Sequence, residues 1–541
     1  MELPNLFEQN ISLYFVCNNY KLFLNPQTNS AQVFAELFTK SDININKKII
    51  FVIGPKQIVI AMKRLLLSVM MLLLLAGCGG SDGGGGEQEP KFKAFEFLTA
   101  DNPQLAKNVQ LYIDSSAATV SGVLTVEVSS MVLVPTFWLG GPATVDGREV
   151  VSGESAVDFS EPVTFEVTTE EGVKRYTVDV KNFSELPVVR ITTNNNAPIV
   201  DKENWIVGTM QIDGKGRFAD MPSTSIEIRG RGNSTWDYPK KPYAIKLSSK
   251  REVAGMPEHK RWVLLAHWND KVNLRTELAF WLGREYADLD WKQGGEQVEL
   301  FLNGEHKGSY FLCEHIKVDK NRIPDGYAIE VDAKAGSDEP VFYTTITNLP
   351  FNVKDPDVEV ASAEFDAVKQ AINDFESVLF GDDFLDEESG YKSIADIGSF
   401  VDWWISNEFS KNKDASFYTS CYLNLTAEGK IKMGPLWDYD LVWGNYVFNF
   451  DITPYINSPE GFWIKDEAAW IERMFEDPEF VALAKEKWGR IYADRAVIVA
   501  KVREMAERQR ASIYLNDLRW QRLSNVGDYS LISRYYDAEV D

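Results

Sequence analysis

Residues 229–247 read RGRGNSTWDYPKKPYAIKL and join a glycine- and arginine-rich turn to an apolar strand that carries a lysine. Glycines let a backbone approach a ligand closely, and guanidinium groups bind phosphate oxygens through two parallel hydrogen bonds. A lysine inside an apolar strand, here Lys246, must direct its ammonium group at a counter-charge or leave it unpaired at a cost. The stretch is therefore typical of a strand–turn–strand unit that approaches an anion. An ordinary β-turn followed by a half-exposed strand lysine remains the alternative.

The sequence around this stretch predicts mainly strands. Strand patterns dominate residues 186–329, and a helical spacing of apolar residues interrupts them at 274–286. Asn303 and Gly304 separate two apolar runs, which predicts a β-hairpin because Asn-Gly favours the primed turns that match strand twist.

The remainder of the chain predicts mainly helices. Helical periodicity begins near residue 361 and ends in a long charged helix at 476–512, with one strand pair near 417–436. Strands first and helices afterwards indicate an α+β domain over residues 187–541.

Residues 91–186 predict a separate all-β module. Residues 123–128, 163–167 and 176–180 alternate with period two, and a turn is predicted at 170–172. Short strands separated by Gly and Pro favour an antiparallel Ig-like β-sandwich. Such a module fits a spacer, and a carbohydrate-binding role is the alternative.

Composition excludes several classes of protein. The hydrophobic content of 45 % excludes wholesale disorder, and the net charge of −24 argues against nucleic acid as a partner. No CxxC pair and no HExxH pattern occurs, which argues against a zinc knuckle, a disulfide framework or a zincin site. A histidine-based metal site or a Ser/His/Asp triad would have to use the only four histidines, which are His259, His267, His306 and His315.

The amino-terminal part predicts an export signal. Residues 62–77 begin Met-Lys-Arg, continue as an apolar run too short for an ordinary membrane span, and end before Cys78 in the pattern Leu-Ala-Gly-Cys. This pattern matches the bacterial lipobox, so we expect Cys78 to be acylated and residues 78–90, which are rich in glycine, to act as a tether. The expected location is the cell envelope, with a lipid anchor in the membrane. Residues 1–61 are interpreted as a gene-model extension, with a cytoplasmic extension as the alternative.

Three aspartates near the middle of the helical part form another motif. Asp414 is followed about two dozen residues later by GPLWDYD at 434–440, which contains Asp438 and Asp440. Carboxylates at a strand end are suited to a hard divalent cation. A lysine, a glycine-rich turn, an isolated Asp and a strand-end Asp are together the groups that phosphoryl transfer requires. Each of them alone also fits a surface or capping role.

These motifs resemble the CotH kinase family. The resemblance rests on RGNSTW at 231–236, KKPYAIKL at 240–247, GSYFLCE at 308–314 and GPLWDYD at 434–440, and it covers roughly residues 186–520. It implies an atypical protein-kinase-like domain, behind the Ig-like sandwich, that transfers phosphate from ATP to Ser or Thr of an unidentified protein substrate.

The resemblance also implies roles for single residues on the nucleotide side. Lys246 would neutralise the ATP phosphates, with Glu277 as its candidate ion-pair partner. Arg231 and Asn233 would shape the turn that faces the nucleotide. Glu314 would be either structural or nucleotide-facing.

On the catalytic side, Asp414 would accept or orient the substrate hydroxyl, and Asp438, with Asp440 as a second candidate, would hold Mg²⁺. Spore-coat members of the family carry an Asn between the two Asp positions, where this chain has Ser420. A neutral hydroxyl is a weak Mg²⁺ ligand, so a pseudokinase is the alternative: a non-catalytic adhesion lipoprotein that contacts glycan or protein. Glycoside hydrolysis by Asp438 and Asp440 beside Trp437 is a third reading, but it leaves the lysine and the glycine-rich turn without a role.

Overall fold

The computed structural model describes residues 92–139, 141–169, 172–448, 452–525 and 529–541, together with two paired strands, β1 (Phe15–Cys17) and β2 (Tyr20–Leu22). The chain divides into two units, Met1–Gln88 and Glu89–Asp541. The predicted signal peptide, Cys78 and the tether lie outside the described residues. No helix within the described ranges is long and apolar enough to cross a membrane.

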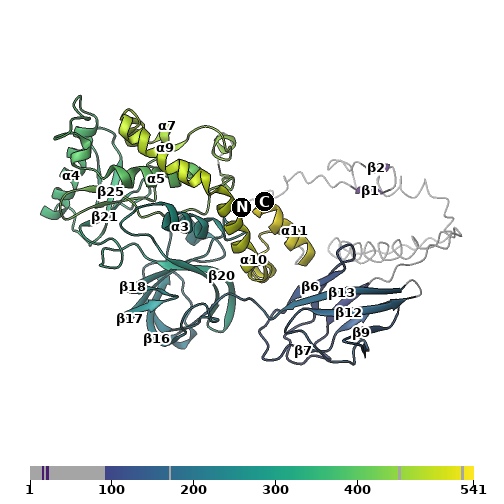
Figure 1. Cartoon of the computed structure of the whole chain (residues 1–541). Helices are drawn as coiled ribbons and strands as arrows, with labels where there is room; N and C mark the ends of the chain where they lie inside the picture. The colour runs from purple at the N-terminus through teal and green to yellow at the C-terminus, as the bar shows by residue number, and fades with distance from the viewer. Residues whose placement is uncertain are drawn as a thin grey trace, which may run out of the picture. The chain divides into compact units, whose positions relative to one another are not determined.

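The first part of the second unit is an all-β region with its own core (Figure 1). It contains a six-stranded sheet in the order β10-β9-β12-β13-β6-β5, a three-stranded sheet β4-β3-β8 and the pair β11-β7. Packed aromatic rings fill its centre, among them Phe92, Phe95, Phe137 and Phe165. The strands are β3 (Ala94–Phe97), β4 (Val109–Gln110), β5 (Tyr112–Asp114), β6 (Thr119–Val123), β7 (Val132–Leu133), β8 (Thr136–Trp138), β9 (Ala143–Val145), β10 (Arg148–Val150), β11 (Val157–Asp158), β12 (Val163–Thr169) and β13 (Gly172–Lys181).

The prediction of an all-β region is confirmed, with two differences in detail. The predicted antiparallel pairing of β12 with β13 is present, but β13 pairs with β6 in parallel. The strand predicted at 123–128 is wrong, because β6 already ends at Val123 and the backbone beyond it bonds elsewhere: the Val128 N–H donates to the side chain of Asn182.

A closed seven-stranded barrel follows. Its strand order is β14-β15-β16-β17-β18-β20-β19, and alternate residues such as Ile226, Ile245 and Leu312 fill its interior. The hairpin β19–β20 turns at Asn303 and Gly304, both with positive φ, as Asn-Gly predicts. The elements are β14 (Val188–Thr193), η1 (Asn194–Asn196), β15 (Ile206–Asp213), β16 (Met221–Gly230), η2 (Ser234–Asp237), β17 (Tyr243–Val253), β18 (Met256–Leu265), α3 (Arg275–Tyr286), β19 (Gly295–Leu302) and β20 (Glu305–Glu314).

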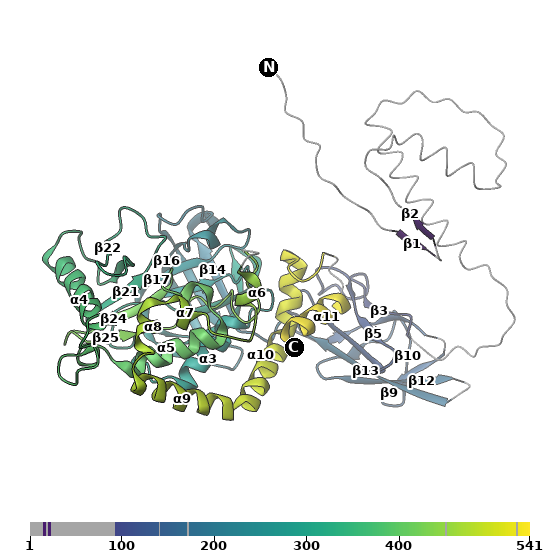
Figure 2. The ribbon, with the colours of Figure 1, turned by 90° about the horizontal axis from the view of Figure 1, so that it is seen from above.

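The last part combines a five-stranded sheet, in the order β22-β23-β21-β24-β25, with helices. The predicted long helix is in fact two, because Asp494 leaves helical geometry between α9 and α10. Figure 2 shows these two helices running in sequence along one side of this part. The elements are β21 (Tyr327–Val331), β22 (Val341–Tyr343), β23 (Pro350–Asp355), α4 (Ala363–Leu379), η3 (Tyr391–Ser393), α5 (Ile397–Ser410), η4 (Lys413–Ala415), β24 (Cys421–Leu425), β25 (Ile431–Met433), α6 (Thr453–Ile456), α7 (Ile464–Glu467), α8 (Ala469–Met474), α9 (Pro478–Ala493), α10 (Arg495–Trp520) and α11 (Tyr529–Val540).

Trp470 on α8 holds the helices against this sheet. Its ring lies 5.4 Å from that of Phe351, 4.8 Å from Phe375 and 5.2 Å from Phe417, measured between centroids. Its Nε1–H donates to Glu376 at 2.9 Å. Phe417 also begins the segment that leads into β24, so this core supports the loop after α5.

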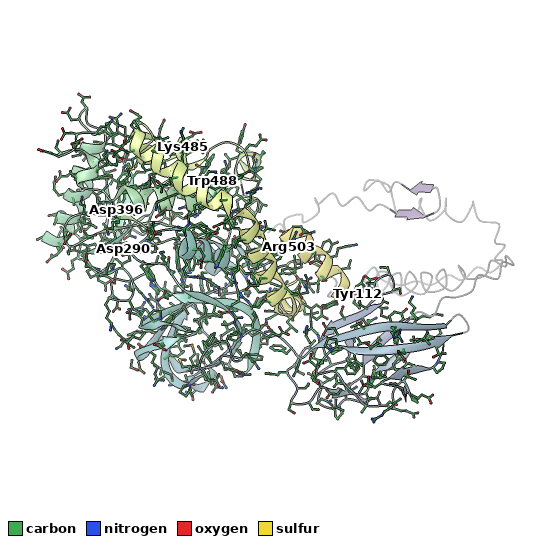
Figure 3. All side chains as sticks on the ribbon, in the orientation of Figure 1. Tyr112, Asp290, Asp396, Lys485, Trp488 and Arg503 are labelled. Atoms are coloured by element: carbon green, nitrogen blue, oxygen red, sulfur yellow. The ribbon has the colours of Figure 1, made fainter. Side chains whose placement is uncertain are left out.

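We predict that Trp470→Ala lowers the free energy of unfolding by about 3–5 kcal/mol, because it empties a packed site and removes one of the donors to the buried Glu376 carboxylate. The control is Trp488→Ala, since Trp488 lies on the surface of α9 (Figure 3) with 39 % of its area exposed. Urea titration followed by circular dichroism measures both. Equal losses in the two variants would contradict the central position of Trp470.

Candidate functional site

Three aspartates approach one another beside the start of β24. Asp414 lies in η4, directly after α5, which ends because Lys411 adopts a left-handed conformation. Asp438 and Asp440 lie in the loop after β25, and Asp438 itself has a positive φ of 66°. Two separate turns therefore place the predicted catalytic and metal-binding carboxylates close together.

The pKa values show how strongly these carboxylates interact. Asp438 can be reached by solvent, yet the surrounding protein desolvates its carboxylate and raises its pKa, and the charge of Asp414 raises it further. Burial, followed by the charges of Asp438 and Asp270, raises the pKa of Asp440 to about 8. The cluster is therefore destabilised by its own negative charge, which a bound cation would relieve.

The donor set fits a magnesium ion that is shared with a ligand. Across the described residues, no three Cys, His, Asp or Glu side chains form a metal site by themselves. Mg²⁺ in proteins is usually held by one or two carboxylates, and water and substrate phosphates complete its shell. Asp438 and Asp440 supply carboxylate oxygens of this kind.

Ser420 contacts the cluster directly. Its hydroxyl donates to Asp438 Oδ2 at 2.9 Å, and its backbone N–H donates to Glu330 Oε1 at 3.2 Å. Burial raises the pKa of Glu330 to about 7, although Lys354 opposes this shift. Sequence reasoning missed Glu330. The available signal was a carboxylate between Ile329 and Val331 in an otherwise apolar strand.

A basic surface lies beside the acidic cluster. Arg231 stacks over Trp437 at 5.5 Å, and its charge lowers the pKa of Asp438, so it connects the two regions. Arg261 stacks over Trp205 at 5.0 Å, and its Nε is buried without a hydrogen-bond partner. In the described part of the chain, neither guanidinium group has a carboxylate within ion-pair distance.

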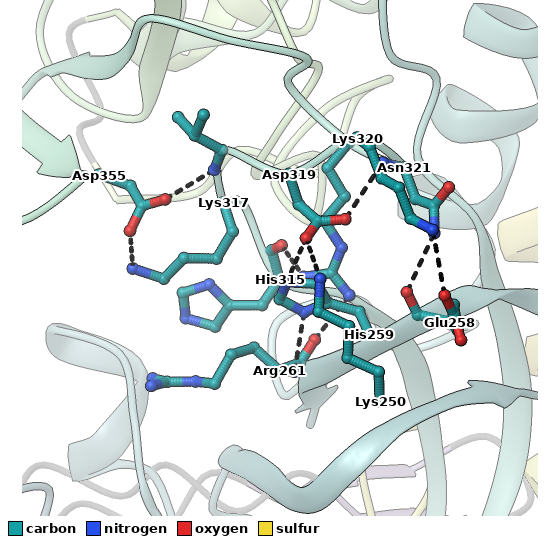
Figure 4. Close-up of polar contacts among 12 residues, drawn as sticks. Lys250, Glu258, His259, Arg261, His315, Lys317, Asp319, Lys320, Asn321 and Asp355 are labelled. Carbon is teal, nitrogen blue, oxygen red and sulfur yellow. Dashed lines mark hydrogen bonds and ion pairs between the residues drawn. The ribbon is translucent and has the colours of Figure 1, made fainter.

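His315 lies among these cations. Burial lowers its pKa well below the usual value, and Arg261, Arg231 and Lys317 lower it further. Figure 4 shows the Arg261 side chain beside His315, and Lys317 paired with Asp355 at 2.5 Å. The histidine is therefore neutral at physiological pH, and the positive charge of this surface belongs to the arginines and lysines.

Lys246 extends the basic surface on the outside of the barrel. Its neighbours Ile245 and Leu247 point into the barrel core, and it lies opposite Arg261 in the strand register. Its Nζ pairs with Glu227 on the adjacent strand at 2.8 Å. The candidate pairing with Glu277 is wrong, because Glu277 is buried and binds Arg508 and Gln509 instead.

Asn233 and Glu314 are the two remaining predicted residues. Asn233 is exposed at the start of η2, and its side chain does not cap that turn. Glu314 is buried, accepts the Gly294 N–H at 2.8 Å and lies 3.8 Å from the buried Arg322 guanidinium, an arrangement that favours the structural role among its two predicted roles.

Cys421 closes the back of the cluster. Its thiol lies 3.4 Å from the backbone oxygens of Asp414 and Thr419 and is completely buried, which raises its pKa well above the usual value. Cys313 is also buried and free.

Comparison with known proteins identifies two regions. Residues 102–180 match a family model described as "SGBP, N-terminal", and residues 228–541 match one described as CotH kinase protein. No curated protein matches the chain. Among solved structures, a "putative glycoside hydrolase" from Bacteroides thetaiotaomicron is 14 % identical, and the match covers 52 % of this chain and 82 % of that chain. Its TM-score of 0.16 is too low to indicate a shared fold. Because the match over residues 228–541 spans more than half of the sequence, the protein belongs to the CotH kinase protein family.

Proposed function

We propose that the protein transfers a phosphoryl group from Mg-ATP to a Ser or Thr hydroxyl of a protein substrate, and that a lipid on Cys78 anchors it in the cell envelope. The observation that carries the catalytic proposal is the position of Arg231 and Arg261. Among the described residues neither has a carboxylate within ion-pair distance, and they lie beside three aspartates that repel one another. A polyphosphate with a bound dication would satisfy both sets of charges.

The unpaired arginines matter because this chain is rich in carboxylates. It carries 80 Asp and Glu against 56 Lys and Arg, so an arginine that needs only a structural partner has many available. A half-buried guanidinium without one indicates an anion supplied from outside. The planar guanidinium group can donate two parallel hydrogen bonds to phosphate oxygens, which a lysine ammonium group cannot.

The remaining roles follow from the same geometry. Lys246, oriented by Glu227, adds a third cation beside Arg261. Mg²⁺ would be held by Asp438 and Asp440, and it would supply charge neutralisation for the phosphates. Asp414, in the neighbouring turn, would accept the proton of the substrate hydroxyl.

We expect Arg231→Gln and Arg261→Gln each to weaken the binding of ATP and of tripolyphosphate about 10- to 100-fold, since a charge-assisted hydrogen bond is worth about 1.5–3 kcal/mol. Arg251→Gln is the matched control, because Arg251 lies exposed on β17. Isothermal titration measures the affinities. If wild-type protein binds neither compound at millimolar concentration, the kinase proposal fails and a non-catalytic adhesion protein is favoured.

Asp414→Asn and Asp438→Asn should separate binding from chemistry. Asp414→Asn keeps the shape of the site, so ATP binding should persist while transfer falls about 10²- to 10⁴-fold. Asp438→Asn should abolish the magnesium dependence of ATP binding, because it removes a charged ligand. A radiolabel transfer assay combined with titration tests both. Wild-type protein that binds Mg-ATP but never transfers phosphate would be a pseudokinase.

The pH dependence of stability provides a test without any ligand. The folded chain holds the Asp440 proton more tightly than the unfolded chain, because the pKa rises from 3.8 to about 8. Asp440 therefore lowers stability progressively as pH rises from about 4 to about 8. We expect Asp440→Asn to raise Tm in EDTA by more at about pH 8.5 than at about pH 5.5. A Tm difference that is independent of pH would contradict the charge repulsion in this cluster.

A further inference from the structure

Two residues that face each other across the site have unusual backbone conformations. Ser420 has φ 59° and Asp438 has φ 66°, and the Ser420 hydroxyl joins them by its bond to Asp438 Oδ2. Residues other than glycine rarely adopt this left-handed region, and such strain gathers at functional sites where surrounding contacts maintain it. Some group must therefore fix the backbone of Ser420.

Glu330 is that group. It accepts the Ser420 N–H with Oε1 and the Tyr422 hydroxyl, at 2.8 Å, with Oε2. Antiparallel pairing of β21 with β24 places Glu330 opposite Tyr422, so the two acceptor oxygens reach the start of β24. Glu330 is buried, and Lys354 lies 3.6 Å from its carboxylate.

A second carboxylate, in the residue directly after β21, supports this arrangement. Asp332 accepts the Thr419 hydroxyl at 3.2 Å, one residue before Ser420. Glu330 lies within β21, and Asp332 directly follows Val331, the last residue of that strand. The turn that carries Ser420 is thus held at two consecutive residues by β21 and the residue after it.

We propose that Glu330 is a positioning residue for the metal site: it fixes the Ser420 hydroxyl on Asp438 Oδ2 and so holds the Asp438 carboxylate in the orientation in which it would bind a divalent cation. This inference rests on the proposed function and adds to it a role for Ser420. Ser420 orients a metal ligand by donating a hydrogen bond, rather than ligating the metal itself. Mutation of a residue that orients a metal ligand typically weakens metal affinity about 10- to 100-fold.

The test measures divalent-cation affinity directly, with Mn²⁺ as an electron-paramagnetic-resonance probe and no nucleotide present. Glu330→Ala and Ser420→Gly should each weaken Mn²⁺ binding about 10- to 100-fold. The double variant should be no weaker than the single ones, because both act through the same hydrogen bond. Glu339→Gln is the matched control, since Glu339 also pairs with Lys354 but does not contact Ser420.

Stability separates positioning from a purely structural role. Glycine accepts a positive φ without strain, so Ser420→Gly should leave Tm unchanged or raised while metal affinity falls. Ser420→Asn should restore the affinity, because asparagine tolerates this backbone region and its amide can donate to Asp438.

The outcomes are distinct. Mn²⁺ affinity in Ser420→Gly and Glu330→Ala equal to that of wild type would overturn the inference and leave the proposed function intact. A wild-type protein that binds no Mn²⁺ would instead remove the metal site on which both proposals rest. If Glu330→Ala does not fold, Ser420→Gly and Ser420→Asn decide the question.

Discussion

Antiparallel pairing of β21 with β24 is the interaction on which the candidate site depends. It joins β21, which carries Glu330 and is directly followed by Asp332, to the strand that separates the Asp414 turn from the Asp438 loop. Without this register, Glu330 would not lie opposite Tyr422, and the turn at Thr419 and Ser420 would lose its acceptors. The backbone ladder thus determines the chemistry of side chains that are about 90 residues apart in sequence.

The site contains two groups of like charges, an acidic cluster and a neighbouring basic surface, and each is unfavourable in the free protein. Carboxylates repel one another near Asp438, while Arg231 and Arg261 near His315 have no carboxylate within ion-pair distance among the residues that the structure describes. Such an arrangement costs stability in the free protein, and the aromatic core around Trp470 offsets that cost. A ligand that carries both signs of charge, a metal-bound polyphosphate, would turn each of these terms into a favourable one.

Local patterns in the sequence predicted local structure well. Asn303-Gly304 specified a hairpin, and the apolar spacing over 274–286 specified a helix, because turn chemistry and amphipathicity act within a few residues. The three aspartates were likewise predicted as site residues from their motifs, and the structure brings them together. Barrel closure and the pairing of Lys246 with Glu227 depend on strand register between distant segments, which no single pattern encodes. Glu330 escaped prediction for the same reason, since its partners come from another strand.

The burial of Cys421 gives the site an internal chemical reporter. The Cys421 thiol contacts the backbone oxygen of Asp414 and is shielded from solvent. This burial raises its pKa, so the thiol stays protonated. A thiol reagent can reach it only when the turn that holds Asp414 opens, so the rate of its alkylation measures how often the acidic cluster comes apart. Ligands that draw the three aspartates together would slow that reaction without touching the cysteine at all.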